Sequence, residues 1–422
     1  MIRFYNGRVL QFEGGVHITD SEVWVDGARI AYVGPAKPQM PELERQIDLR
    51  GSLLIPGFKN AHAHSAMTFL RSLADDMPLD KWLGEQVWPN EAKLTPDGAY
   101  VMTKLAIMEY LSSGMTSCFD MYFHNDACVA ASIDAGFRMV LCGDMNDFDA
   151  DYKLLEEKYN KYNSVNELVS YRMGFHAEYT TCLERMEYVA SLAHKYKTPV
   201  FTHLAETKKE VAGCVERWGD TPAVLLDRLG MFDYGGGGFH CVHMSDEDIA
   251  VFRRRGLWAV LNPASNLKLA SGIAPLCRFA EEGIGMALGT DGAGSNNALD
   301  MFREMYLAAC LAKVRENDSA AGGADIALRA ACVGGAYVMG LSDCDAIAPG
   351  KLADLAVIDL DMPNMRPLNN IAKNLVYSGS KQNVRLTMVN GRVLYEDGVF
   401  HIGEDAGKIY EEAERIMETI RR

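Results

Sequence analysis

The chain has 422 residues, 48% of them hydrophobic and 23% charged, which is typical of a globular protein with a large domain and a smaller one. Its formal net charge of −15 argues against a nucleic-acid partner, because nucleic-acid-binding proteins gather Lys and Arg on one face. No apolar run approaches the ~18 residues that a membrane span needs, so we expect no membrane partner either.

The two ends of the chain share one pattern of short apolar segments and tight turns. Asp26-Gly27 separates two such segments near the N-terminus, and Asn390-Gly391 separates two more near the C-terminus, each a two-residue hairpin signature. Neither end has enough strands to bury a core by itself. We therefore expect residues 1–55 and 349–403 to form one small composite β-sandwich domain.

The stretch from residue 56 to residue 348 alternates apolar runs with helical patterns, such as the helix predicted over 97–113. Candidate strands lie at 53–55, 116–119, 138–142, 171–175, 199–202, 237–239, 257–261 and 285–288. Eight strands separated by helices, over slightly more than the ~250 residues usual for this α/β fold, predict a (β/α)₈ TIM barrel. Apolar residues at helical spacing within 404–422 predict a C-terminal helix that packs on the body.

Two features predict a cytoplasmic compartment. Residues 1–7 lack the basic segment followed by an apolar stretch that marks an export signal. The ten cysteines occur without a CxxC pair, often inside apolar stretches such as 116–119, which favours reduced, buried thiols.

Metal-binding side chains follow the predicted strands, at the end of the barrel where active sites lie. His62 and His64 are two apart, so in an extended segment both side chains point the same way and can hold one ion. On their own they could equally form a polar cluster. Other strand ends add His176, His203, Glu206, His240, His243 and Asp291. Three imidazoles and a carboxylate suit one divalent cation, Zn²⁺ or Fe²⁺, with a position left open for water; this set is His62, His64, His203 and Asp291.

Six segments of the chain resemble the amidohydrolase superfamily. They are PGFKNAHAHSAMTFLR (56–71), WPNEAKLT (88–95), THLAET (202–207), FHCVH (239–243), NPASNLKLASG (262–272) and LGTDGAGSNNALDM (288–301). More narrowly, they resemble its 5′-methylthioadenosine/S-adenosylhomocysteine deaminase group, kin to the guanine deaminases and triazine hydrolases. The likeness runs nearly end to end, and it implies a homo-oligomer.

The resemblance also implies a role for each matched residue. The metal ligands would be the set just given, and Glu206 would carry a proton to the ring nitrogen. His240, together with Asp291, would orient and deprotonate the attacking water. This agrees with the chemistry, because hydrolytic deamination needs hydroxide at the amine-bearing carbon, a proton for the adjacent nitrogen and a proton for the departing ammonia.

The end of the fourth predicted strand, residues 171–176, contains no lysine. Many superfamily members carry there a carbamylated lysine that bridges two metals, so we expect a mononuclear site, which favours deaminases over cyclic-amide hydrolases. His243 is expected to support the site or pack beside it rather than bind the metal.

Four substrate contacts follow from the resemblance alone. Glu91 would accept hydrogen bonds from the ribose hydroxyls, for which a carboxylate is well suited. His176 would lie near the sugar or purine, Trp82 would pack on the substrate, and Ser295 would line the site. The alternative for Glu91 is an exposed helix-cap residue.

Two departures from the family bear on the substrate. Arginines that receive an amino-acid carboxylate are usual after the third strand, whereas residues 144–151 contain four aspartates and no arginine. Glu178 stands where a proline is usual, which adds an acid near the mouth. An anionic substrate tail would be repelled by such a loop, unless the loop is only a solvated surface.

We therefore expect a metal-dependent deaminase of an aminopurine, with an adenosine-type nucleoside that carries a neutral 5′ group as substrate. Candidates are 5′-methylthioadenosine, 5′-deoxyadenosine and adenosine. The alternative is a hydrolase of another amine- or halogen-bearing heterocycle, such as guanine or an s-triazine.

Overall fold

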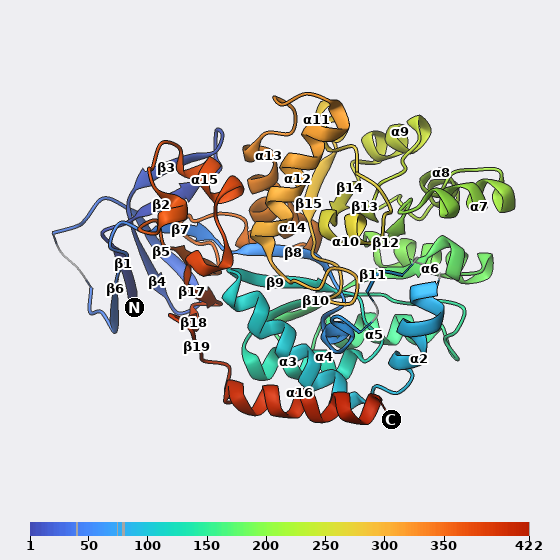
Figure 1. Cartoon of the computed structure of the whole chain (residues 1–422), viewed down its shortest axis with the longest axis horizontal. Helices are drawn as coiled ribbons and strands as arrows, with labels where there is room; N and C mark the ends of the chain where they lie inside the picture. Colours follow the sequence, from blue (N-terminus) through green and yellow to red (C-terminus); the bar gives the residue numbers. More distant parts are fainter. Residues whose placement is uncertain (39–40, 74, 78–80, 422) are drawn as a thin grey trace.

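The computed structural model describes residues 1–38, 41–73, 75–77 and 81–421 (Figure 1). Its centre is an eight-stranded parallel sheet whose neighbours follow the order of the chain. The strands are β8 (Phe58–Ala63), β9 (Met115–Asp120), β10 (Arg138–Cys142), β11 (Val169–Ala177), β12 (Val200–Leu204), β13 (Gly236–His240), β14 (Trp258–Leu261) and β15 (Gly285–Leu288). The predicted (β/α)₈ barrel is confirmed.

The first and last strands of this sheet meet and close the barrel. Just beyond β15, the Asp291 amide donates a hydrogen bond of 2.9 Å to the carbonyl of His62 in β8. Buried apolar side chains from all around the barrel fill its interior, among them Ala61, Phe119, Phe201, Phe239 and Val260. The barrel is therefore a packed support for the side chains at its C-terminal end, not a pore.

Helices surround the barrel in the connections between strands (Figure 1). They are α3 (Pro96–Ser112), α4 (Asn125–Ala135), α5 (Leu154–Tyr162), α6 (Leu183–Tyr196), α7 (Lys208–Trp218), α8 (Pro222–Arg228), α9 (Asp246–Arg255), α10 (Pro263–Lys268), α11 (Leu276–Glu281), α12 (Met301–Glu316), α13 (Ala324–Arg329) and α14 (Gly335–Met339). Helix α3 illustrates why a helix begins and ends where it does. The Thr95 side chain caps its N-terminus by accepting a hydrogen bond from the Gly98 amide, and Gly114, in the left-handed conformation at φ +76°, follows its C-terminus.

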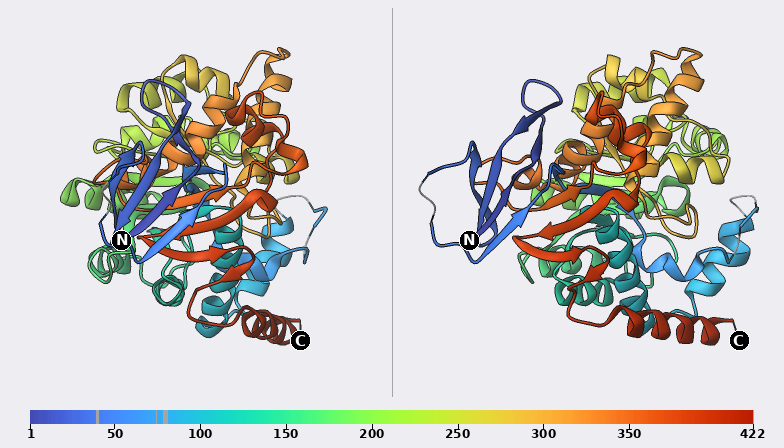
Figure 2. Two further views of the ribbon diagram at one scale, coloured as in Figure 1. Left: turned by 90° about the vertical axis from the view of Figure 1, so that its left-hand side faces the viewer. Right: turned by 60° about the vertical axis from the view of Figure 1, so that its left-hand side comes forward.

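Strands from both ends of the chain build two further sheets beside the barrel (Figure 2). One has the order β5-β4-β1-β6 and the other β19-β18-β17-β16-β7-β2-β3. The bounds are β1 (Ile2–Tyr5), β2 (Arg8–Gln11), β3 (His17–Asp20), β4 (Glu22–Asp26), β5 (Arg29–Gly34), β6 (Arg45–Asp48), β7 (Leu53–Pro56), β16 (Leu355–Ile358), β17 (Val384–Val389), β18 (Arg392–Glu396) and β19 (Val399–Phe400). Apolar residues of both sheets, including Phe4, Val25, Leu54, Leu355 and Met388, form one buried cluster. The exact domain boundaries stay a prediction.

The assignment of residues 53–55 to the first barrel strand is wrong. These residues form β7, which pairs with β16 and β2 in the seven-stranded sheet, and the first barrel strand is β8. A short apolar run buried on both faces looks alike in either sheet, so the sequence pattern could not distinguish them.

The C-terminal helix α16 (Ala406–Ile420) lies along α3 (Figure 1). It buries Ile409, Ala413, Met417 and Ile420, and the Lys93 ammonium donates to the Ile420 carbonyl at 2.8 Å. The short helix α15 (Ile371–Tyr377) packs against α12 and α13. Within the described ranges, none of the helices has the length and apolar character needed to cross a bilayer.

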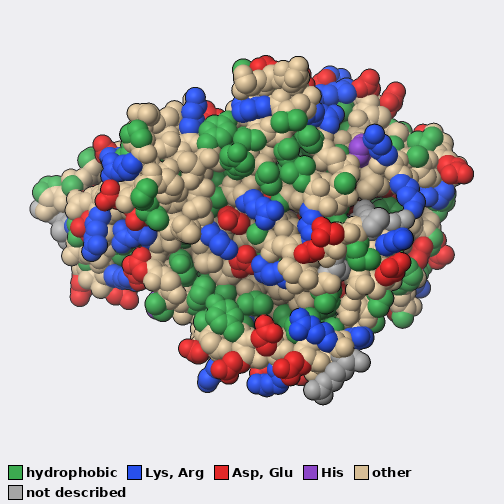
Figure 3. Space-filling view, in the orientation of Figure 1, with side chains coloured by type: hydrophobic (Ala, Val, Ile, Leu, Met, Phe, Trp, Pro, Cys, Tyr) green, Lys and Arg blue, Asp and Glu red, His purple; other side chains and the backbone are tan. Residues whose placement is uncertain are grey.

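All ten cysteines are free thiols; seven are buried as expected, whereas Cys277 and Cys310 are half-buried and Cys182 is exposed. Acidic and basic side chains are interspersed over the face shown in Figure 3, without a broad basic patch. That face therefore does not offer the concentrated positive charge that a phosphate backbone needs.

Candidate metal centre and active site

A cavity of about 410 Å³ opens at the C-terminal ends of the barrel strands. Its walls include most of the side chains that the sequence singled out: His64, His176, His203, Glu206, His240 and Asp291. Because these residues lie in or just beyond the C-terminal ends of five different strands, the closure of the barrel brings them together.

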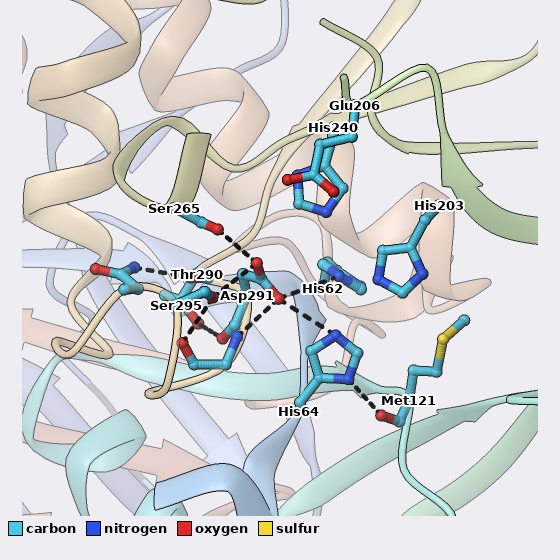
Figure 4. Close-up of polar contacts among 12 residues, drawn as sticks. His62, His64, Met121, His203, Glu206, His240, Ser265, Thr290, Asp291 and Ser295 are labelled. Carbon is cyan, nitrogen blue, oxygen red and sulfur yellow. Dashed lines mark hydrogen bonds and ion pairs between the residues drawn. The ribbon is translucent and has the colours of Figure 1, made fainter. Parts of the chain in front are cut away.

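His62 and His64 project from β8 toward Asp291 (Figure 4). The Nε2 atoms of His62 and His64 lie 3.5 and 3.2 Å from the Asp291 Oδ1. The His64 Nδ1 donates to the Met121 carbonyl at 2.6 Å, which leaves its Nε2 free to bind an ion. His62 is fully buried, and neither of its ring nitrogens has a hydrogen-bond partner among the described residues.

His203 and His240 complete the cluster from the ends of β12 and β13. The His203 Nδ1 donates to the His176 carbonyl at 2.7 Å, and the His240 Nδ1 donates to the Asn266 Oδ1 at 2.8 Å. Both rings therefore present a bare Nε2. One ring nitrogen each of His62, His203 and His240 lie within 4.8 Å of one another, as do ligand atoms of His62, His64 and Asp291.

This arrangement fits a divalent cation. Burying an imidazole whose two nitrogens have no partner among the described residues, as at His62, is costly unless a ligand satisfies one of them. The separations of 3.2 and 3.5 Å are those expected between ligands that share one ion at bonds of ~2.1 Å. Imidazole nitrogens and one carboxylate are the donor set that zinc takes in catalytic sites.

The electrostatics of the cluster agree with that assignment. Burial and the neighbouring rings hold the pKa values of His62 and His203 well below their usual range, so both rings are neutral and each can offer a nitrogen to a cation. Burial opposes charge on Asp291 too, yet the His64 ring beside it holds the pKa of the carboxyl well below its usual range. For His64, contact with Asp291 outweighs burial and raises the pKa to about 9, so a proton competes with a cation there.

Glu206 is presented by a tightly held turn after β12. The Glu210 carboxylate accepts the amides of Ala205, Glu206 and Thr207 at 2.6, 2.8 and 3.3 Å, and Thr207 caps α7 in return. Ala205 adopts a left-handed φ of +51°, which costs ~1 kcal/mol in a non-glycine residue. This strained backbone conformation therefore costs some stability, and it points the Glu206 side chain into the cavity.

One segment after β14, residues 262–272, contacts all three residues expected to handle protons. The Ser265 hydroxyl donates to the Asp291 Oδ2 at 2.6 Å, and the Ser271 hydroxyl donates to the Glu206 Oε1 at 2.9 Å. Asn266 accepts from His240, as described above. Sequence reasoning assigned no role to these side chains, although the segment NPASNLKLASG was among the resembling motifs.

The four residues expected to contact substrate all line the cavity: Trp82, Glu91, His176 and Ser295. Glu91 is half-buried, not an exposed cap, and burial raises its pKa to about 7. The Ser295 hydroxyl donates to the Asp291 Oδ2 at 2.8 Å. His243 stands outside the metal-ligand groups and donates through Nε2 to the Ser271 carbonyl at 2.7 Å.

The acidic loop after β10 is part of the cavity wall. Asp144, Asn146, Phe148 and Asp149 line it, so the loop is more than a solvated surface. The expectation for Glu178 is wrong: its side chain lies outside the cavity lining, is buried, and pairs with Arg217 at 2.7 Å. The guanidinium neutralises this acid, so it adds no charge at the mouth.

Comparisons with known proteins agree on one family. The model of the amidohydrolase family matches residues 53–394. The chain is 38% identical over 400 residues to the 5-methylthioadenosine/S-adenosylhomocysteine deaminase of Thermococcus onnurineus (strain NA1), covering 93% of each chain. It is 38% identical over 366 residues to the 5′-deoxyadenosine deaminase of Methanothermobacter thermautotrophicus, covering 85% of this chain and 86% of the relative. Its fold matches a zinc-bound adenosine deaminase from Xanthomonas campestris with a TM-score of 0.94 and 32% identity, covering 100% and 98% of the two chains.

Proposed function

This chain belongs to the amidohydrolase family, and from that premise we propose that it releases ammonia from an adenosine-type nucleoside with a neutral 5′ group. One observation carries the proposal: Glu206, His240 and Asp291 converge on one cavity beside the buried histidine cluster. The 5′-deoxyadenosine deaminase of Methanothermobacter thermautotrophicus, at 38% identity, supports a neutral 5′ group. The protein is a metal-dependent aminohydrolase.

We assign the metal ligands to His62, His64, His203 and Asp291. A divalent cation held there, of which zinc fits the donor set, would make hydroxide available near neutral pH. The His240 Nδ1–H donates a hydrogen bond to the Asn266 side chain, so its free Nε2 is a base for the attacking water.

Deamination exchanges the C–NH₂ group for a carbonyl and consumes one water. The adjacent ring nitrogen takes one proton, and the amine takes another as it leaves as ammonia. Glu206 is the residue placed to carry them, because Ser271 holds its Oε1 and its other oxygen remains available. Asp291 accepts from Ser265 and Ser295 through Oδ2, which fixes its Oδ1 toward the histidines.

We expect Ser271→Ala to lower kcat about tenfold, because the lost hydrogen bond is a typical one and frees the Glu206 carboxylate to rotate. Zinc content should stay at the wild-type level, since Ser271 lies outside the metal-ligand groups. Steady-state ammonia release and elemental analysis of the same samples check both statements. Unchanged kcat would remove Ser271 from the positioning of Glu206.

Glu91 gives the enzyme a pH-dependent KM. With a pKa of about 7, Glu91 is a carboxylate above that pH and can accept two ribose hydroxyls, whereas the protonated acid below it cannot. KM for 5′-deoxyadenosine should rise about tenfold from pH 8 to pH 6, as the ionised fraction falls from about 0.9 to about 0.1. Glu91→Gln should show a higher KM that no longer changes over this range; a flat wild-type profile would exclude Glu91 from sugar binding.

The proposal is tested by ammonia release from the zinc-loaded protein with 5′-methylthioadenosine and S-adenosylhomocysteine side by side. We expect turnover of the neutral nucleoside and little turnover of the one with a carboxylate tail, because the loop of residues 144–151 has no arginine to receive it. Equal turnover of both would refute this account of specificity but leave the deaminase. Turnover of free guanine instead of nucleosides would favour the alternative substrate class.

We also propose that the enzyme acts in the cytoplasm as a homo-oligomer and without a nucleic-acid partner. The net charge of −15 supports the absence of a nucleic-acid partner, and the ten free cysteines support the cytoplasm. The homo-oligomer follows from the resemblance to the family alone. Sedimentation of the zinc-loaded protein would test the oligomeric state.

A further inference from the structure

The cavity has a graded depth from the metal ligands to its mouth. Asp291 and Glu206 are each only 6% exposed, Glu91 is half-buried, and Trp88 and Phe148 are 41% and 75% exposed. Trp88 and Glu91 lie three residues apart on α2 (Trp88–Glu91), so both face the same side of that turn. A nucleoside whose base reaches Glu206 and whose ribose reaches Glu91 therefore places its 5′ group beside Trp88.

The wall at that position is acidic. Among the described residues that line the cavity there is no Lys or Arg, while Asp144 and Asp149 belong to the wall. Lys158 neutralises Asp144 at 3.3 Å from behind the loop. Asp149 instead accepts the Asn146 amide at 2.9 Å, and in the described part of the chain no ion pair joins it to a cation.

Arg185 lies behind the same loop and does not balance the charge of Asp149. Its guanidinium binds the backbone carbonyls of Asn146 and Asp149, the latter at 3.0 Å, and faces the Asp147 carboxylate at 3.5 Å. Its charge therefore pairs with Asp147, and its hydrogen bonds to the backbone carbonyls hold the loop in this conformation. Within the described ranges, Asp149 therefore remains a carboxylate at the mouth without an ion pair to a cation of its own.

Two aromatic rings complete this position. The rings of Trp88 and Phe148 lie 5.5 Å apart between centroids, and both line the cavity. Aromatic faces attract cations, as a carboxylate does, so Trp88, Phe148 and Asp149 all favour a positively charged group at this position.

Resting on the proposed function, we propose that Asp149, Trp88 and Phe148 form a subsite for a positively charged 5′ substituent, an ammonium or a sulfonium. The enzyme then accepts neutral nucleosides, prefers cationic ones and disfavours anionic ones. The cation would break no ion pair of Asp149 with any residue that the structure describes.

The test compares kcat/KM for 5′-amino-5′-deoxyadenosine, 5′-deoxyadenosine and adenosine 5′-carboxylate with the zinc-loaded enzyme. At low ionic strength we expect the amine to exceed the neutral nucleoside about fivefold and the carboxylate to fall below it, as a single accessible charge pair allows. The advantage of the amine should shrink in 0.5 M salt, because ions screen accessible charges. A neutral nucleoside that equals or exceeds the amine would overturn the subsite.

Asp149→Asn keeps an oxygen for the Asn146 amide but removes the charge, so the ratio of amine to neutral nucleoside should fall to about one. Asp151→Asn is the matched control, because Asp151 belongs to the same loop, is exposed and does not line the cavity. Its ratio should match the wild type, and an unchanged ratio in Asp149→Asn would overturn the role of Asp149. If 5′-deoxyadenosine is not deaminated at all, the proposed function fails and the subsite fails with it; if it is and the amine has no advantage, only the subsite fails.

Discussion

Replacement of Glu206 by Gln is expected to lower kcat about 10³-fold while the zinc content stays unchanged, because a positioned proton carrier contributes about 10²–10⁴-fold. The amide of Gln keeps an oxygen to accept from Ser271, so the side chain can hold its place. It cannot carry the protons that the ring nitrogen and the departing ammonia need. Ammonia release and elemental analysis of one preparation separate lost chemistry from lost metal.

Glu206→Asp is the companion variant for that experiment. It retains a titratable carboxyl but draws it back by one methylene from Ser271 and from the substrate. We expect kcat between those of the wild type and the Gln variant, because proton transfer survives at a longer distance. A fully active Gln variant, or an Asp variant as inactive as Gln, would contradict the assigned proton transfer.

The residues of the candidate site could be found from the sequence because of where they lie along the chain. His62, His203 and His240 lie in the last two residues of their strands and Asp291 lies just beyond β15, and a closed barrel brings all such positions to one face. The fold itself was predictable for a related reason, since seven of the eight barrel strands, β9 to β15, are apolar runs separated by helical patterns.

The sequence pattern does not predict strand β8, because the strand lacks the run of apolar residues that usually indicates a buried strand. All six of its residues are buried, yet Lys59, Asn60 and His62 are polar. The Lys59 ammonium donates to the Gly57 carbonyl and the Thr116 hydroxyl at 2.6 and 2.8 Å, and Asn60 donates to Thr290 at 2.8 Å. Partners from distant segments make this burial tolerable, and a hydropathy pattern contains no information about them.

The hydrogen bonds that hold the candidate catalytic side chains could not be predicted from the sequence for a related reason. Nothing local to Ser265 or Ser271 shows that one hydroxyl meets Asp291 and the other meets Glu206, because these contacts span 26 and 65 residues. Glu178 illustrates the reverse error, since an acid in a presumed mouth loop turned out to be paired with Arg217, 39 residues away. Residue type indicated the chemistry, and only the fold could indicate the partners.

The second large effect is expected at His62. His62→Ala should abolish zinc binding and lower kcat at least about 10³-fold, because the hydroxide nucleophile depends on the bound cation. The position is central: His62 belongs to both groups of ligand atoms that lie within 4.8 Å of one another. Elemental analysis after gel filtration gives the zinc stoichiometry, and ammonia release gives kcat.

Thermal unfolding provides a readout of the same substitution that does not depend on turnover. A ligand that binds only the folded state at about 1,000 times its Kd raises the free energy of unfolding by about 4 kcal/mol, so chelation should lower the Tm of the wild type. His62→Ala should lose this zinc-dependent shift. His243→Gln, which retains a donor for the Ser271 carbonyl and lies outside the ligand groups, should keep it. If His62→Ala still gains Tm with zinc and binds it stoichiometrically, the cation is held by other residues, and the unpaired nitrogens of His62 need a different explanation.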